Sequence, residues 1–130
     1  MEIVLPWPDR VLHPNARPHW HTKAKAAKFA REQGYLLARM AGCTSASFAG
    51  YDGKLHLFID YYAKTRNYPD ADGCLSSSKS WIDGISDALG VNDRRFVFHP
   101  FVKDETHKGG KVCIRITKGT EISAIDRILK

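Results

Sequence analysis

The segment from Lys54 to Lys64 sets the strongest constraint on what this chain can fold into. Apolar side chains stand at every second position of it, namely Leu55, Leu57, Ile59, Tyr61 and Ala63. Because successive side chains of a β-strand point to opposite faces of a sheet, this alternation predicts a strand with one buried face. Helices elsewhere in the chain must then cover that face.

Two segments have the periodicity of amphipathic helices. The first is expected from Thr22, as its N-cap, to about Ala41, and Gly42 ends it. One side of this helix is apolar, with Ala26, Phe29, Ala30, Leu37 and Met40. The other side is basic, with Lys25, Lys28, Arg31 and Arg39. The second helix is expected over about Cys74–Leu89, with Gly90 as its C-cap and a narrow stripe formed by Leu75, Ser78, Ile82, Ile85 and Leu89.

Three more strands complete the expected fold. They cover residues 2–7, about Arg95–Asp104 and Lys111–Lys118, and Gly109 and Gly110 suit a hairpin turn between the last two. In the tail, Ile122, Ile125 and Leu129 stand at helical spacing. The order β-α-β-α-β-β-α predicts a fold of the broad α/β class, more closely an α+β two-layer fold in which helices pack on a mixed sheet. We expect a single domain that spans residues 1–130.

Composition and charge narrow the functional class. The chain has 130 residues, of which 43% are hydrophobic, as in a single globular domain. It carries 20 Lys and Arg against 14 Asp and Glu, so its formal charge of +6 favours an acidic partner such as nucleic acid.

No apolar run is long enough for a membrane span, and the first residues do not resemble a signal peptide. We therefore expect a cytoplasmic protein with no membrane partner. The three cysteines lie far apart and indicate neither disulfides nor zinc.

Positive charge is concentrated near the N-terminus. Between Arg10 and Arg31 there are six cations and no acidic residue. Such a run is either a solvated face or a surface that follows the phosphates of DNA. The expected DNA-binding residues are Arg10, Arg17, Lys23, Lys25, Lys28 and Arg31, together with Arg66 further along the chain. Trp20 and Trp81 are expected to pack in the core or an interface rather than to stack on bases.

Acidic residues gather just before the second helix, where the sequence reads Asp70-Ala71-Asp72. Two carboxylates separated by one residue in an extended segment project the same way, as a pair of ligands for Mg²⁺ or Mn²⁺ must. Such a site, with Lys79 as a cation beside the phosphate, suits hydrolysis of a phosphodiester. Alternatively, Asp70 and Asp72 form a turn and a helix N-terminus, and Lys79 and Asp83 form a helical surface pair.

These residues resemble the RusA family of Holliday junction resolvases, the crossover junction endodeoxyribonucleases of bacteria and their phages. The resemblance spans about residues 3–118 and includes Leu5-Pro6-Trp7-Pro8, Asn15-Ala16-Arg17 and Trp20. Its most specific part is the ordered series Asp70, Asp72, Lys79, Asp83 and Asp93. The resemblance implies that Asp70, Asp72 and Asp93 are catalytic and bind the metal, and that Lys79 is an essential lysine. It further implies a homodimer that acts in DNA recombination and repair, and nicks four-way DNA junctions symmetrically with Mg²⁺ or Mn²⁺.

The sequence departs from the family pattern at three positions. Gly73 stands where the family has Asn, and Asn92 replaces the first acid of an Asp-Asp pair. Lys79 follows Asp72 by seven residues where the family has four, an insertion of about one helical turn that keeps Lys79 four residues before Asp83. These changes leave open a second reading, a nonenzymatic junction-binding protein with a decayed acidic site. A third is a small basic protein that binds RNA or duplex DNA without structural preference.

The expected length of the second helix raises the question of how the acidic residues meet. About 16 helical residues would separate Asp72 from Asp93 by roughly 24 Å, which no single metal site spans. Two arrangements follow. Two subunits pack this helix antiparallel through its apolar stripe, so that each site combines Asp70 and Asp72 of one subunit with Asp93 of the other. Alternatively, Gly84 or the following loop returns Asp93 within the same chain, and the stripe faces the sheet.

Overall fold

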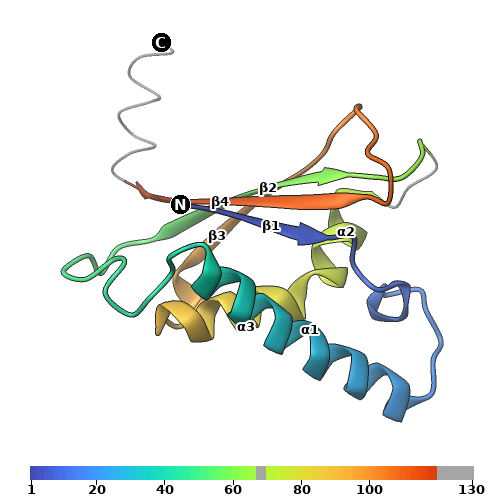
Figure 1. The fold of residues 1–130 in the computed structure, drawn as a ribbon, viewed down its shortest axis with the longest axis horizontal. Coiled ribbons are helices and arrows are strands. Elements are labelled where there is room, and N and C mark those ends of the chain that lie inside the picture. Colours follow the sequence, from blue (N-terminus) through green and yellow to red (C-terminus); the bar gives the residue numbers. More distant parts are fainter. Residues whose placement is uncertain (67–69, 120–130) are drawn as a thin grey trace.

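The computed structural model describes residues 1–66 and 70–119, which form a sheet layer and a helix layer (Figure 1). The strands are β1 (Glu2–Pro6), β2 (Leu55–Tyr62), β3 (Phe96–Val102) and β4 (Lys111–Lys118). The helices are α1 (Trp20–Met40), α2 (Ala71–Ser77) and α3 (Lys79–Leu89), with the short 3-10 helices η1 (Arg10–Leu12) and η2 (Asp93–Arg95). The predicted α+β two-layer class with a mixed sheet is confirmed. The expected tail helix lies outside the described residues.

The sheet has the strand order β1-β4-β2-β3. β4 is antiparallel to both β1 and β2, whereas β2 and β3 are parallel. The alternation predicted for β2 is confirmed, because its side chains at Leu55, Leu57, Ile59 and Tyr61 are fully buried and the intervening ones are not. All three helices lie on the side of the sheet toward which these residues point (Figure 1).

The predicted hairpin between β3 and β4 is wrong, since β2 lies between these two strands. Gly109 and Gly110 do adopt the positive φ angles of turn residues, 81° and 74°, but the turn is part of a connection that crosses over β2. Pro100 of β3 has no N–H to donate, which confines this strand to an edge. β4 alternates buried residues along its length and so takes an inner position.

Helix α1 begins earlier than expected and buries only part of the expected face, in which Ala30 is buried and Ala26 and Leu37 pack partly buried against the core. The imidazole Nδ1 of His19, not Thr22, caps it by accepting from the backbone N–H of His21 at 3.2 Å. The buried residues are the small ones Ala30, Gly34 and Ala38. Phe29 and Met40, both expected on the apolar side, are 65% and 82% exposed. The positions of the small residues, rather than those of the largest apolar residues, thus decide which face of α1 packs against the rest of the protein.

Two glycines let α1 and α3 approach closely. A Cβ added at Gly34 would collide with the backbone of Trp81, and one added at Gly84 would collide with the carbonyl of Arg31. Gly84 therefore serves helix packing and is not a hinge. On the rim of this contact, the Arg31 guanidinium binds Asp87 through two hydrogen bonds of 2.7 and 2.9 Å.

The single helix predicted over Cys74–Leu89 is divided at Ser78 into α2 and α3. The hydroxyls of Ser77 and Ser78 donate to the carbonyls of Gly73 and Cys74, each at 2.9 Å. Hydrogen bonds from Ser to the carbonyl four residues earlier bend helices. The buried Ser78 hydroxyl also meets the Tyr61 hydroxyl of β2 at 2.9 Å, which fixes the bend against the sheet.

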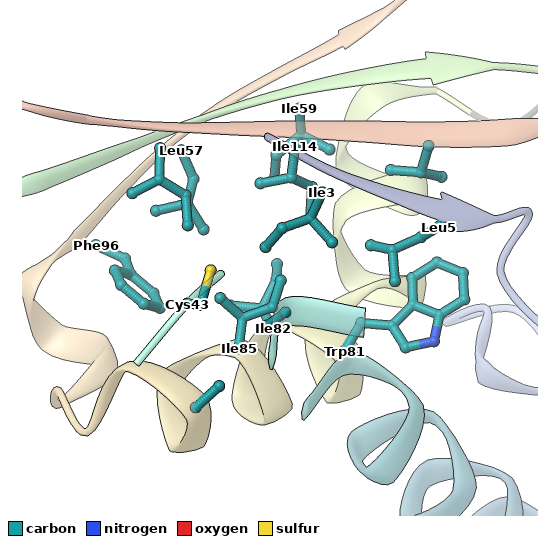
Figure 2. Close-up of a cluster of buried hydrophobic side chains, with 14 of the residues drawn as sticks. Ile3, Leu5, Cys43, Leu57, Ile59, Trp81, Ile82, Ile85, Phe96 and Ile114 are labelled. Carbon is teal, nitrogen blue, oxygen red and sulfur yellow. The ribbon is translucent and has the colours of Figure 1, made fainter. Parts of the chain in front are cut away.

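The apolar stripe of the second helical segment faces the sheet. Ile82 and Ile85 project toward the strands, where Ile3, Leu57 and Ile114 lie (Figure 2). Ser78, Ile82, Ile85 and Leu89 are all buried. The idea that this stripe joins two subunits is therefore wrong, because the sheet of the same chain already covers it.

Candidate acidic site at the junction of two helices

Asp70 and Asp72 lie at the start of α2. Asp70 is the N-cap of this helix, and its Oδ1 accepts from the N–H of Gly73 at 2.8 Å. Asp72 belongs to the first helical turn, and both carboxylates are exposed. The expected extended pair with parallel side chains is not formed, because the chain is already helical at Ala71. The alternative interpretation, a cap followed by an acid in the first turn, describes the local structure.

Lys79 connects the other acidic residues. Its Nζ donates to Asp93 Oδ2 at 3.0 Å and lies 3.5 Å from Asp83 Oδ1. Partial burial alone would lower the pKa of Lys79, but the hydrogen bond to Asp93 and the charges of Asp83 and Asp93 raise it. The same hydrogen bond lowers the pKa of Asp93. Lys79 is therefore a protonated cation held between two carboxylates.

The loop after α3 brings Asp93 back to Lys79. Gly90 ends the helix in the left-handed conformation at φ 64°, and the Val91 N–H then donates to the carbonyl of Ser86. Asn92 starts η2 as its N-cap, with its side-chain oxygen accepting from the N–H of Arg94 at 2.9 Å. Of the two arrangements considered from the sequence, the structure has the return within one chain and the stripe facing the sheet. The return is made by this loop and not by Gly84.

The return shortens the separation of the acidic residues without closing it. An uninterrupted helix would separate Asp72 from Asp93 by roughly 24 Å. In the structure Asp93 lies beside Lys79, which follows Asp72 by seven residues, or about 10 Å of helix. Mg²⁺ needs its oxygen ligands at about 2 Å. Within residues 1–66 and 70–119, no group of three or more His, Cys, Asp or Glu side chains is placed to hold a metal ion. As arranged in one chain, Asp70, Asp72 and Asp93 do not fit a shared Mg²⁺ or Mn²⁺.

A cavity of about 320 Å³ opens beside α2 and was not foreseen from the sequence. It lies between α2 and the segment around η1, and its lining residues are Trp7, Pro8, Asp9, Arg10, His13, Cys74 and Ser77. Cys74 and Ser77 follow Asp70 by four and seven residues, so the cavity borders the helical face that Asp70 begins. Burial raises the pKa of the Cys74 thiol to about 11, which keeps it protonated. Pro6-Trp7-Pro8-Asp9 was the available signal, since it forces an irregular turn after β1.

The predicted DNA-binding residues are placed in three ways. Arg10 and Arg17 line a shallow depression around η1. Lys23, Lys25 and Lys28 are exposed along the first half of α1, and Arg66 is exposed in the segment after β2. Arg31 differs, because its ion pair with Asp87 already engages its guanidinium. The structure thus keeps most of the basic run on the surface and assigns Arg31 to helix packing.

The two tryptophans of the sequence prediction have different environments. Trp81 of α3 is buried, and its indole N–H donates to Gln33 of α1 at 3.1 Å, as expected for a core residue. Trp20 is 67% exposed at the start of α1, where its ring stacks on that of His19 and lies tilted against that of His21. Core packing of Trp20 is therefore wrong, because the first turns of α1 extend beyond the partner helices (Figure 1).

Comparison with known proteins gives a relative whose role is not described. An uncharacterised protein of Xylella fastidiosa (strain Temecula1) is 46% identical over 119 residues, which cover 92% of this chain and 77% of the relative. The chain belongs to the family of this Xylella protein. No family model matches the chain.

Among solved structures, the periplasmic domain of Helicobacter pylori MotB aligns with 97% of this chain and 88% of its own length. Its TM-score is 0.36 and its identity is 14%, an overlap too slight to indicate a shared fold. In the part of the chain that the structure describes, no helix is long and apolar enough to cross a membrane.

Proposed function

We propose that this protein is a structure-selective endodeoxyribonuclease of the RusA type that resolves four-way DNA junctions by paired symmetric nicks. The observation that carries the proposal is the contact between Lys79 and Asp93, 3.0 Å apart although 14 positions separate them in the sequence. It joins two members of the RusA-like series, one at the start of α3 and the other in the loop that follows α3. A small cavity lined by Cys74 and Ser77 of α2, and by Arg10 of η1, lies on the other side of the α2–α3 junction.

Each residue has a role in this proposal that follows from its chemistry. Lys79 offsets the negative charge that develops on the phosphate during hydrolysis. Asp83 and Asp93 hold the lysine protonated and orient it, as their distances of 3.5 and 3.0 Å indicate. Asp70 and Asp72 add carboxylates at the start of α2. Mg²⁺ or Mn²⁺, when bound, would supply an activated water, and Asp70, Asp72 and Asp93 would first have to come together to hold it.

A homodimer is part of the proposal, because two symmetric nicks require two sites related by a two-fold axis. The stripe of α3 is buried, so the contact must use another surface. Phe29, Leu36 and Met40 stand on one face of α1 at spacings of seven and four residues, and all are exposed. This α1 stripe is the apolar surface on which we place the second subunit.

The first test is cleavage of a mobile four-way junction in the presence of Mg²⁺. The wild-type protein is expected to nick the junction, and Asp72→Asn is expected to bind it without nicking. Asp52→Asn, in the loop before β2, is the matched control and is expected to nick normally. If Asp72→Asn still nicks the junction, the Asp72 carboxylate is not required for cleavage.

A mixing experiment then tests whether two subunits share a site. We expect heterodimers of Asp70→Asn with Asp93→Asn to stay inactive, since the loop returns Asp93 to Lys79 within its own chain. Recovered nicking in the mixture would instead show that Asp93 acts on the Asp70 and Asp72 of the other subunit.

One specific observation favours a second candidate, a junction-binding protein without nuclease activity. Oxygens of both Asp70 and Asn92 accept hydrogen bonds from backbone N–H groups as helix caps. Together with the separation of the aspartates, this suits an acidic site that has lost its metal. Tight binding without cleavage in both Mg²⁺ and Mn²⁺ would establish this candidate.

A further inference from the structure

The face of the sheet that points away from the helices carries a second group of side chains, independent of the acidic residues. Within the described residues, α1, α2 and α3 all lie on the opposite side (Figure 1). Strand register aligns the residues of the open face in rows that cross the sheet. The central row is Glu2, Arg115, Phe58 and His99, and the next is Val4, Cys113, Asp60 and Phe101.

Aromatic rings and cations alternate on this open face. The ring of Phe58 stacks on His99, with centres 4.5 Å apart, and the Arg115 guanidinium lies 5.0 Å from the Phe58 ring centre. His56 stacks on His99 in turn, at 5.1 Å. Near the far end of β2, the Lys111 ammonium stands 4.8 Å from the ring centre of Tyr62. These aromatic rings are therefore each in contact with a neighbouring ring or cation.

Phe101 gives this ordered group an accessible aromatic surface. It lies two residues after His99 on the edge strand β3, and it is 54% exposed. A phenylalanine so exposed on a sheet gains little from folding, since most of its apolar area stays in water. Its position beside the stacked rings extends them toward solvent.

The charge of the open face favours a polyanion over a second copy of the chain. Arg115, Lys111 and Lys103 outnumber the two acids of this face, which are Glu2, opposite Arg115, and Asp60, 3.8 Å from Lys103. Two copies of this face would oppose their cations, which costs binding energy. Phosphate groups complement the same cations. Aromatic side chains next to cations on an open surface are what binding of single-stranded nucleic acid requires, because unpaired bases stack and phosphates pair.

We propose that the open face of the sheet binds single-stranded DNA, with bases stacking on Phe101 and phosphates contacting Arg115 and Lys111. A regular duplex is excluded from this mode, since its bases are already stacked on one another. The site lies on the opposite side of the sheet from the acidic residues. Its occupation therefore neither requires nor implies nicking.

The proposal is tested by binding of a fluorescein-labelled oligothymidine to the full chain in EDTA at low salt. We expect the wild-type protein to bind it, and Phe101→Ala to bind it at least about 5-fold more weakly, the loss of one stacked base. Tyr35→Ala is the matched control, because Tyr35 is an exposed aromatic residue of α1 on the helix side and lies outside the α1 stripe, and it is expected to bind as the wild type does. Arg115→Gln is expected to reduce the slope of log affinity against log salt by about one unit.

Three results would overturn the proposal. The first is no binding of oligothymidine by the wild-type chain. The second is an equal effect, or none, of Phe101→Ala and Tyr35→Ala. The third is a change of oligomeric state in Phe101→Ala during sedimentation, which would assign the face to contact between copies. Junction nicking in Mg²⁺ is measured separately, so failure of one proposal does not affect the other.

Discussion

At the scale of single residues, Lys79 connects structure to the proposed chemistry. Its ammonium group bridges an acid on its own helix and an acid from the returning loop. An ammonium group between two carboxylates is protonated at all physiological pH values, so it can offset phosphate charge but cannot serve as a base. The proposed mechanism needs this ammonium group to exchange Asp93 for a phosphate group of the DNA.

Replacing Asp93 tests this arrangement directly. In Asp93→Asn the pKa of Lys79 is expected to fall, because the hydrogen bond and one of the two opposing charges that raise it are lost. Titration of the lysine side-chain signals by NMR measures the change, with Asp52→Asn as a control of equal charge. A pKa of Lys79 that is the same in both variants would show that the contact is absent in solution.

Ser78 is the residue on which the bend between α2 and α3 depends. Burial raises the pKa of Tyr61, and the hydrogen bond to Ser78 is what satisfies its buried hydroxyl. Ser78→Ala is expected to lower the free energy of unfolding by about 1–3 kcal/mol, since it leaves that hydroxyl without this partner. Ser76→Ala, on the exposed side of α2, is expected to change it by less than about 0.5 kcal/mol. Urea unfolding measures both, and equal losses would contradict this role of Ser78.

At the scale of elements, the contact between α1 and α3 is set by glycines. Gly84→Ala is expected to destabilise the protein by about 1 kcal/mol or more, because the new methyl group meets the backbone of α1 and overpacking exceeds the gain in helix propensity. Arg39→Ala, exposed on α1, is the control and should have little effect. Thermal unfolding compares them. An unchanged midpoint for Gly84→Ala would contradict the close packing of these helices.

Local patterns predicted the elements well and their partners poorly. The alternation in β2 and the caps at Gly42 and Gly90 depend on neighbouring residues, so the sequence indicates them directly. The order of the strands depends on which two of the four take the inner positions of the sheet, and no local sequence pattern indicates this. The hairpin between β3 and β4 was predicted wrongly for this reason. The face of α1 was predicted only in part, because close packing against Trp81 and Gly84 prevailed over the burial of Phe29.

The candidate site shows the same division. That Asp70 caps a helix could be predicted, since a cap involves residues within one turn. The return of Asp93 within its own chain could only be considered as one of two alternatives, because it depends on the direction of the chain after Gly90, and the contact of Asp93 with Lys79 was not predicted. The cavity lined by Asp9 and Cys74 joins segments about 60 residues apart, and nothing in either segment indicates the other.

At the scale of the whole molecule, the net charge of +6 is unevenly distributed. Cations extend along η1 and the first half of α1, and acids surround the α2–α3 junction.

If the basic surface holds DNA, junction affinity is expected to fall steeply between about 50 and 200 mM salt. Replacing Lys23, Lys25 and Lys28 by Gln should reduce the salt slope by nearly three units. Arg31→Gln should change it less, because Asp87 already neutralises Arg31. A slope unaffected by the triple substitution would place DNA elsewhere.

The proposed activity is cleavage of branched DNA, and the positions of the cuts distinguish junction resolution from other nicking. A mobile four-way junction is labelled on each of its four strands in turn and incubated with the protein and Mg²⁺. We expect nicks at symmetric positions in two opposing strands, and we expect no nicks with Asp72→Asn or on a linear duplex of the same sequence. A junction that is bound in every arm of the experiment and left intact in both Mg²⁺ and Mn²⁺ would contradict it.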